Sequence, residues 1–352
     1  MIHFMRSIAA AVAVVLLAAP ALAATRTWSG TAGNLWSNPA NWGGTLPVAG
    51  DDLLFPAAAN KFNTNDLPAG TVFHSITFTD GSYSLGGNAI GLSSGVSSTA
   101  AGTVNTFNFA TTTLTAPQTW SSIPFALLNA GATNVNGQTL TLANQDSLII
   151  NSISGGGAIV QAGSGRSQAD LSTFTGTITV NGGQFFLFSG SAGNLAVTGG
   201  ELVIQSSNVG AISATGGTFT LAHQSSSGSL TLGPGAIFNG ALSPTPASML
   251  TVNGTVTLGN ATLHLHSFFP AAGPFVLIDN DGVDAVNGTF LGLPDGGIVN
   301  VDGTSYRISY AGGTGNDVTL TAVGPAVPLL EPGALALLAL ALAATALVAL
   351  RR

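Results

Sequence analysis

The sequence predicts an all-β protein whose body is a right-handed parallel β-helix, also called a β-solenoid. Three observations predict this fold: apolar and polar residues alternate along the body, pairs of glycines recur at a constant spacing, and only 6% of the 352 residues are charged. Alternation with period two is typical of strands, and it is clear in residues 139–142, 175–180 and 256–258. Ordinary soluble domains contain roughly a quarter charged residues. A stacked coil needs fewer, because Ser, Thr and Asn can cover its flat faces.

The glycine pairs define a repeat. They lie at 182–183, 199–200 and 216–217, so each pair begins the same distance along the chain after the one before, and Gly233 continues the series. Each pair should supply a left-handed corner, and the apolar residues after it should stack from coil to coil. The expected interior rows are Phe185 with Leu202 and Phe219, and Leu187 with Ile204 and Leu221.

A β-sandwich of hairpins is the alternative architecture. Asn-Gly dipeptides, which are hairpin turn signals, occur at 136–137, 181–182, 253–254 and 287–288. Repetition at a constant spacing favours the solenoid over the sandwich.

The chain begins with a predicted signal peptide over residues 1–23. Arg6 precedes an apolar stretch from 8 to 19, and Ala21 and Ala23 form a small-x-small cleavage site. A transmembrane anchor is the alternative, but the apolar stretch is short and a cleavage site follows it. We therefore expect an exported chain that starts near Ala24.

The other end predicts a transmembrane helix with a basic tail over residues 333–352. Residues 333–350 carry no charge and, at about 1.5 Å per residue, would span roughly 27 Å as a helix. Arg351 and Arg352 follow directly, which favours a cytoplasmic C-terminus and an exported body. A helix buried in a globular core is the alternative.

This end resembles the C-terminal sorting signal of exosortase-processed PEP-CTERM proteins, in which a short motif precedes a membrane helix and a basic tail. The first proline of the usual Pro-Glu-Pro motif is replaced by Leu330, while residues 327–330 are similar to the related IPTL-type signal. The resemblance implies a Gram-negative envelope protein that is held transiently in the inner membrane and then cleaved by an exosortase-type protease. The sorting residues it implies are Pro328, Glu331, Pro332, Gly333, Arg351 and Arg352.

Two blocks flank the repeats and, with them, resemble the β-helical passengers of autotransporter-like surface proteins. The N-terminal block contains Trp28, the run 35–42 and Phe55, and the C-terminal block contains 275–282 and 312–320. The predicted organisation is a signal peptide (1–23), a Trp-rich N-terminal capping block (24–75), solenoid repeats (76–250), a C-terminal β block (251–323), a linker with the sorting motif (324–332) and the membrane helix with its tail (333–352).

Composition excludes several functions. The chain has 7 basic against 14 acidic residues and no cysteine. Nucleic acid is therefore excluded as a partner, and so are disulfides, thiolate metal sites and Cys nucleophiles. Glu201 is the only glutamate of the body, and no set of acid, base and electrostatic stabiliser is readable, so we predict no enzymatic activity. Trp28, Trp36 and Trp42 could stack against sugars or, alternatively, seal the end of the solenoid core.

Metal binding is predicted at one place, and no other cofactor is expected. Asp279, Asp281 and Asp284 offer three carboxylates close together in the sequence, near enough to hold Ca²⁺. Residues 312–317 match one unit of a calcium β-roll, although such rolls bind between tandem copies. The alternative for both loops is turn chemistry, in which Asp and Asn accept backbone hydrogen bonds. The histidines at 264 and 266 could ligate zinc, but two ligands are fewer than a zinc site needs, so we interpret them as part of an exposed strand face.

These features favour a non-enzymatic structural protein of the bacterial surface or extracellular matrix, related to adhesion or biofilm. Its expected partners are the secretion machinery, the sorting protease, the inner membrane transiently, and extracellular polysaccharide. The alternative is a secreted β-helix protein that binds carbohydrate or degrades polysaccharide as a lyase or hydrolase.

Overall fold

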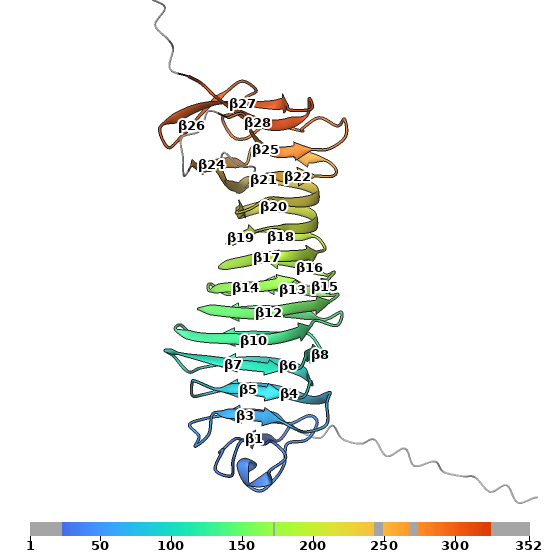
Figure 1. Cartoon of the computed structure of the whole chain (residues 1–352), viewed down its shortest axis with the longest axis vertical. Coiled ribbons are helices and arrows are strands. Elements are labelled where there is room, and N and C mark those ends of the chain that lie inside the picture. Colours follow the sequence, from blue (N-terminus) through green and yellow to red (C-terminus); the bar gives the residue numbers. More distant parts are fainter. Residues whose placement is uncertain (1–22, 172, 243–248, 268–272, 325–352) are drawn as a thin grey trace, which may run out of the picture.

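The computed structural model describes residues 23–171, 173–242, 249–267 and 273–324, and these form one elongated stack of coils (Figure 1). The prediction of an all-β solenoid is confirmed, with about nine turns. Colour runs in order from one end of the stack to the other, so neighbours in sequence are neighbours in space (Figure 1). Such a topology lets each coil pack only on the coils before and after it.

The first part of the stack holds the short 3₁₀ helix η1 and nine strands. Their bounds are β1 (Thr25–Thr27), η1 (Pro39–Trp42), β2 (Asp52–Phe55), β3 (Phe62–Asn65), β4 (Thr71–Phe78), β5 (Ser84–Gly87), β6 (Ile90–Ser98), β7 (Thr103–Phe109), β8 (Thr112–Leu114) and β9 (Gln118–Ser122).

The middle strands are β10 (Ala126–Asn134), β11 (Thr139–Asn144), β12 (Ser147–Gly155), β13 (Ala158–Gln161), β14 (Arg166–Leu171), β15 (Thr173–Phe174), β16 (Thr177–Val180), β17 (Gln184–Ala192), β18 (Leu195–Val197), β19 (Glu201–Ile204), β20 (Ser207–Leu221) and β21 (Ser225–Leu242). The last strands are β22 (Leu250–Val252), β23 (Val256–Thr257), β24 (Thr262–Ser267), β25 (Phe275–Asn280), β26 (Ile298–Val301), β27 (Thr304–Gly312) and β28 (Asp317–Ala322).

Each coil in the regular part contributes to three parallel ladders. Residues 184–187 pair with 201–204, residues 190–192 with 207–209, and residues 195–197 with 212–214. The offset between partners is the same in each ladder, and it equals the spacing of the glycine pairs. All three faces of a coil therefore contain the same number of residues per turn as the coil before, and equivalent positions of successive coils lie above one another.

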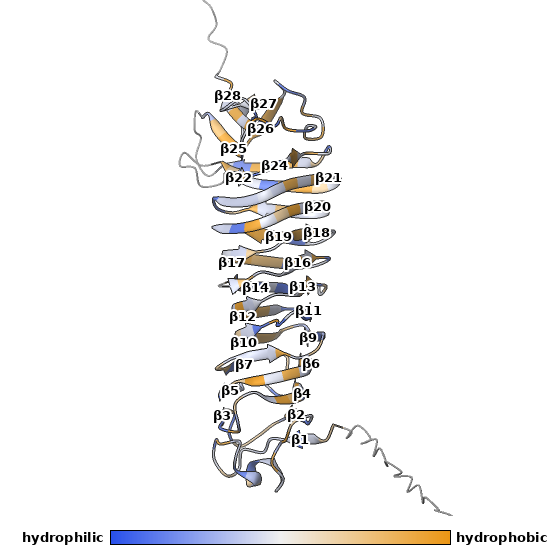
Figure 2. Cartoon of the chain, turned by 90° about the vertical axis from the view of Figure 1, so that its right-hand side faces the viewer, coloured by the Kyte–Doolittle hydropathy of each residue, from blue (hydrophilic) through white to orange (hydrophobic). Residues whose placement is uncertain are grey.

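The predicted interior rows are confirmed. Phe185 pairs with Leu202, Leu202 with Phe219, and Phe219 with Phe238 in the following coil. These side chains are buried, and so is the second row of Leu187, Ile204 and Leu221. Hydrophobic and hydrophilic stretches lie close together on the strands (Figure 2), and buried residues alternate with more exposed ones, as in β11 and β16. Each coil therefore sends one set of side chains inward and the other outward.

The glycine corners are confirmed at the second residue of each pair, but the repeat does not extend to Gly233. Gly183, Gly200 and Gly217 have φ values of 57°, 65° and 67°. The register then shifts after Ala214, and Gly216 pairs with Gly235. The next coil is thus longer than its predecessors, and the match of Gly233 to the spacing is a coincidence.

The hairpin sandwich is wrong for the repeats, because their ladders are parallel. Asn136 and Gly137 do turn with positive φ, yet the strands around them pair with neighbouring coils and not with each other. Antiparallel pairing is limited, among the described strands, to the C-terminal end. There β28 pairs with β25 and β27, and β26 pairs with β27.

The predicted signal peptide, the sorting motif and the C-terminal helix lie outside the described residues, except that Ala23 begins the described part. Within that part, no helix has both the length and the apolar character needed to cross a membrane.

Candidate functional site

The three tryptophans of the N-terminal block are interior residues. Trp28 and Trp36 are 0% exposed and Trp42 is 4% exposed. Their ring centroids lie 5.0 Å apart for Trp28 and Trp42 and 5.5 Å apart for Trp36 and Trp42, both edge to face. Each indole N–H donates within the fold, to the carbonyl of Asn60, the Asn63 side chain and the carbonyl of Trp36 respectively. The rings therefore offer no platform to a sugar, and they fill the end of the core.

The basic groups of the body do not gather with acids in one groove. Arg26 bonds to Asp51 at 2.7 Å and Lys61 to Asp80 at 2.6 Å. The Lys61 ammonium, as a hydrogen-bond donor, holds the pKa of the Asp80 carboxyl below its usual value. Both pairs lie near the N-terminal end of the stack, and both tie one coil to the next.

The other two arginines lie on different parts of the molecule. Arg307 donates to the carbonyl of Gly296 at 2.8 Å in the C-terminal strands. Arg166 starts β14, and its guanidinium lies 3.9 Å from the ring centroid of Phe186, which is a cation–π contact. A proton-abstracting base beside several carboxylates, as a lyase or hydrolase would use, is not assembled around either arginine.

The two calcium candidates lie against each other and are held by protein hydrogen bonds. Asp317 is 3% exposed; its Oδ1 accepts from the backbone N–H of Asn280 at 3.0 Å, and its Oδ2 accepts from that of Thr314 at 2.9 Å. The Asn316 amide donates to the carbonyls of Asp281 and Asp284 at 3.2 and 3.1 Å. The second loop thus follows the turn chemistry that the sequence offered as its alternative.

The carboxylates of the first loop do not converge. Across the described segments, no three His, Cys, Asp or Glu side chains come close enough together to hold a metal ion. Asp281 and Asp284 are exposed, while Asp279 accepts a hydrogen bond from the Thr251 hydroxyl at 3.4 Å in the preceding coil.

The histidine pair lies on β24, and its strand alternates as predicted. Leu265 is buried between the two histidines, and His264 is exposed. The His264 ring lies 3.2 Å from the Asn239 amide oxygen of the neighbouring coil. Through this contact His264 joins a row of polar side chains on the outside of the solenoid.

That outer row links successive coils through side chains. The Glu201 carboxylate accepts from Gln184 at 2.8 Å and from the Thr220 hydroxyl at 2.7 Å, and Asn239 donates to Thr220 at 3.2 Å. The only glutamate of the body therefore serves to connect coils. Beside it, the rings of Phe186 and Phe188 project outward from β17 and stack at 6.1 Å with planes 18° apart.

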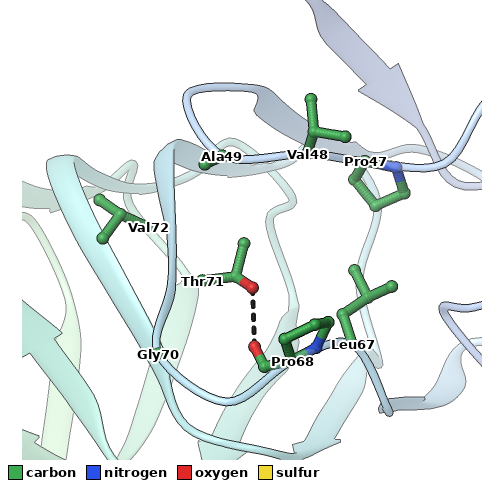
Figure 3. A pocket seen from close by; sticks show the side chains of 8 residues that line it. All are labelled: Pro47, Val48, Ala49, Leu67, Pro68, Gly70, Thr71 and Val72. Atoms are coloured by element: carbon green, nitrogen blue, oxygen red, sulfur yellow. Dashed lines mark hydrogen bonds between the residues drawn. The ribbon is translucent and has the colours of Figure 1, made fainter.

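One hollow of the surface is apolar. It holds about 430 Å³ between the loop of Pro47, Val48 and Ala49 and the turn that precedes β4, which includes Leu67 and Pro68 (Figure 3). The hydroxyl among its lining residues belongs to Thr71, and it donates to the carbonyl of Pro68 at 2.7 Å (Figure 3). The lining contains no titratable side chain that could move a proton, and its Thr71 hydroxyl already donates within the protein.

A second hollow is polar and runs along a corner of the solenoid. This corner groove holds about 690 Å³ and is lined by Gly190, Ser206, Ser207, Asn208, His223, Gln224, Ser225, Ser226 and Thr251. Gly190 pairs with Ser207, Ser207 donates its backbone N–H to Ser225 Oγ at 3.2 Å, and Ser226 pairs with Thr251. The groove thus crosses four successive coils.

The groove has a buried floor, whose side chains are hydrogen-bonded within the protein, and an exposed rim, whose side chains are not bonded to other described residues. Ser207 and Ser225 are buried, and each hydroxyl donates to a nearby carbonyl, at 2.9 and 3.1 Å. The side chains of Asn208, His223 and Gln224 are exposed and make no hydrogen bond to another described residue. Ser206, also on the rim, has a φ of 51°, a left-handed conformation that non-glycine residues rarely adopt and that often occurs at ligand sites.

Sequence reasoning missed this groove. The signal that could have revealed it is the recurrence of short polar runs at 206–208 and 223–226, about one coil apart. Comparison of the chain with protein-family models, with curated proteins and with solved structures gives no match.

Proposed function

We propose that the protein is a non-enzymatic structural protein, exported by a Gram-negative bacterium to its surface or extracellular matrix, where it contributes to adhesion or biofilm. The observation that carries the proposal is the unbroken, charge-poor solenoid, whose core extends from the buried tryptophans to the antiparallel C-terminal strands. A rod of this kind presents long regular faces outside the cell. Right-handed winding belongs to the proposal, because crossovers between parallel strands are right-handed in about 98% of cases.

The chain ends carry the export part of the proposal. A signal peptide cleaved after Ala23 would direct the chain through the secretion machinery, and residues 333–352 would hold it briefly in the inner membrane. An exosortase-type protease would then release it at the motif around Glu331 and Pro332.

The test is the intact mass of the protein recovered from the cell surface. We expect a form that lacks residues 1–23 and the C-terminal helix. Replacing the motif by Glu331→Gln with Pro332→Ala should leave a longer form in the inner membrane, while Pro328→Ala tests the IPTL-type signal separately. A surface form that still carries Arg352 would contradict processing, and turnover of polysaccharide by the purified chain would contradict the non-enzymatic assignment.

A further inference from the structure

We propose that the corner groove binds a neutral glycan chain lying along the solenoid axis. This inference rests on the proposed export, because a polysaccharide of the matrix is met outside the cell. It names a partner for the exported rod and places the contact at one corner of the stack, where Gly190, Ser207, Ser225 and Thr251 follow one another from coil to coil.

The chemistry of the lining indicates a ligand rich in hydroxyl groups. The groove is lined by hydroxyl, amide and imidazole side chains and by a glycine, and it contains no Asp, Glu, Lys or Arg. An amide both donates and accepts, and a sugar hydroxyl does the same, so each can satisfy the other. A carboxylate or phosphate would find no lysine or arginine to pair with in this lining, which is why we infer a neutral ligand.

The rim offers groups that the protein itself does not use. Asn208, His223 and Gln224 project from adjacent coils, and their side chains make no hydrogen bond to another described residue. Binding therefore requires no internal hydrogen bond of these side chains to break. The floor beneath them is part of the parallel ladders, so little backbone freedom is lost when a ligand is held.

The dimensions suit a chain better than a single sugar. Successive coils lie about 4.8 Å apart, so the four coils along the groove span roughly 14 Å. A volume of about 690 Å³ is within the usual range for ligand sites. Because the groove runs from coil to coil, it lies along the axis and can hold several sugar units in a row.

An aromatic surface lies next to the groove. Phe188 precedes the groove residue Gly190 by two positions on β17, and its ring stacks with that of Phe186, which Arg166 covers. The apolar face of a sugar ring packs well on an exposed aromatic ring. We therefore expect Phe188 to contact the glycan at the β17 end of the groove.

The experiment measures binding of the full-length chain to a panel of polysaccharides by affinity electrophoresis and calorimetry. The neutral members are dextran, laminarin, xylan and mannan, and the acidic members are alginate and polygalacturonate. We expect at least one neutral polymer to bind. Asn208→Ala and Gln224→Ala should each weaken the affinity about fivefold to tenfold, the usual effect of one lost hydrogen bond. Phe188→Ala should weaken it by a similar factor.

The matched control is Asn108→Ala, the same substitution at an exposed position of β7, several coils away from the groove. It should leave the affinity unchanged, and the circular dichroism of every variant should match that of the unaltered chain.

Absence of binding to all neutral polymers, preference for the acidic ones, or equal affinity in groove and control variants would overturn the inference. Dimers that the Phe188 variant abolishes would assign this surface to a second copy of the chain instead. If the binding assay fails, the proposal of export still stands on the surface-mass test. If the surface-mass test fails, glycan binding by the purified chain can still be measured in vitro.

Discussion

The glycine-cornered coils and the C-terminal strands continue the same core in opposite ways. From β18 to β20 each strand runs parallel to its partner in the preceding coil and repeats it at a fixed spacing. At the C-terminal end, β25 still pairs parallel with β22, but its other partner, β28, is antiparallel. A parallel stack always leaves an open edge to which another strand can add. The comparison teaches that repetition builds the rod, whereas a non-repeating fold-back covers its last edge.

The largest expected effect comes from comparing two deletions of one coil. One deletion keeps the register of the following strands, and the other shifts it by one residue. Removing residues 201–217 takes out one whole repeat, so Thr218 follows Gly200 and Phe219 takes the place of Leu202 above Phe185. This variant should keep a β-type circular dichroism spectrum and unfold cooperatively. Removing 201–218 takes one residue more and moves the following strand by one position, which turns its core residues outward.

Limited proteolysis distinguishes the two deletions. The shorter deletion should resist cleavage as the parent chain does, and the longer one should be cut readily after residue 200. Equal protease resistance would mean that a corner absorbs the missing residue, and that register does not govern the repeats.

The second test compares the inside and the outside of the same coils. Phe219 is fully buried in the core row, with the ring of Phe238 at 5.7 Å in the next coil. Phe219→Ala should cost about 3 to 5 kcal/mol of unfolding free energy, because it leaves a cavity between coils. Phe188→Ala, on the outer face, should cost less than about 1 kcal/mol. Urea denaturation measures both, and equal losses would contradict the stacked interior.

The third test asks how closely the coils approach. Gly190 and Gly33 both have a φ of 103°, so alanine is strained at either position. A Cβ at Gly190 would collide with the carbonyl oxygen of Leu171 in the coil below, whereas a Cβ at Gly33 meets no atom within 4 Å. Gly33→Ala should cost about 1 to 2 kcal/mol from the left-handed backbone alone. Gly190→Ala should cost about 1 to 3 kcal/mol more. Denaturation midpoints that shift equally would show that coil contact is unimportant there.

The regular coils could be predicted because each one repeats both its corner and its core residues. Gly200 and Leu202 have counterparts at Gly217 and Phe219, so the repeat can be recognised in the sequence from two successive coils. Nearer the N-terminus the same fold is concealed, because coil length varies. Residue 25 of β1 pairs with residue 52 of β2, whereas residue 62 of β3 pairs with residue 84 of β5, so no constant spacing marks these coils in the sequence.

The corner groove could not be predicted for a different reason. Its lining comes from residues far apart in sequence, such as Gly190 and Thr251, and their meeting depends on how long each intervening coil is. The constant spacing ends along β20, where Asn208 pairs with Ser226, one residue beyond that spacing, and Gly216 pairs with Gly235, two residues beyond it. Polar residues at 206–208 and 223–226 therefore read only as outer surface until the coils are stacked.

The smallest expected effect concerns the fold-back itself. Both oxygens of the buried Asp317 carboxylate accept backbone hydrogen bonds, one from Asn280 at the end of β25 and one from Thr314 in the turn before β28. Asp317→Ala leaves these two N–H groups without their acceptor and should cost about 1 to 3 kcal/mol. Asp281→Ala, at an exposed side chain of the adjoining loop, should stay within about 0.5 kcal/mol.

Hydrogen exchange shows where the Asp317 variant loosens. Protection should fall in β25 and β28 and remain unchanged in β17 to β19, because each part of a solenoid contacts only its neighbours. Loss of protection along the whole stack would mean that the C-terminal fold-back holds the coils together, and the division between a repeating rod and its separate end would then be wrong.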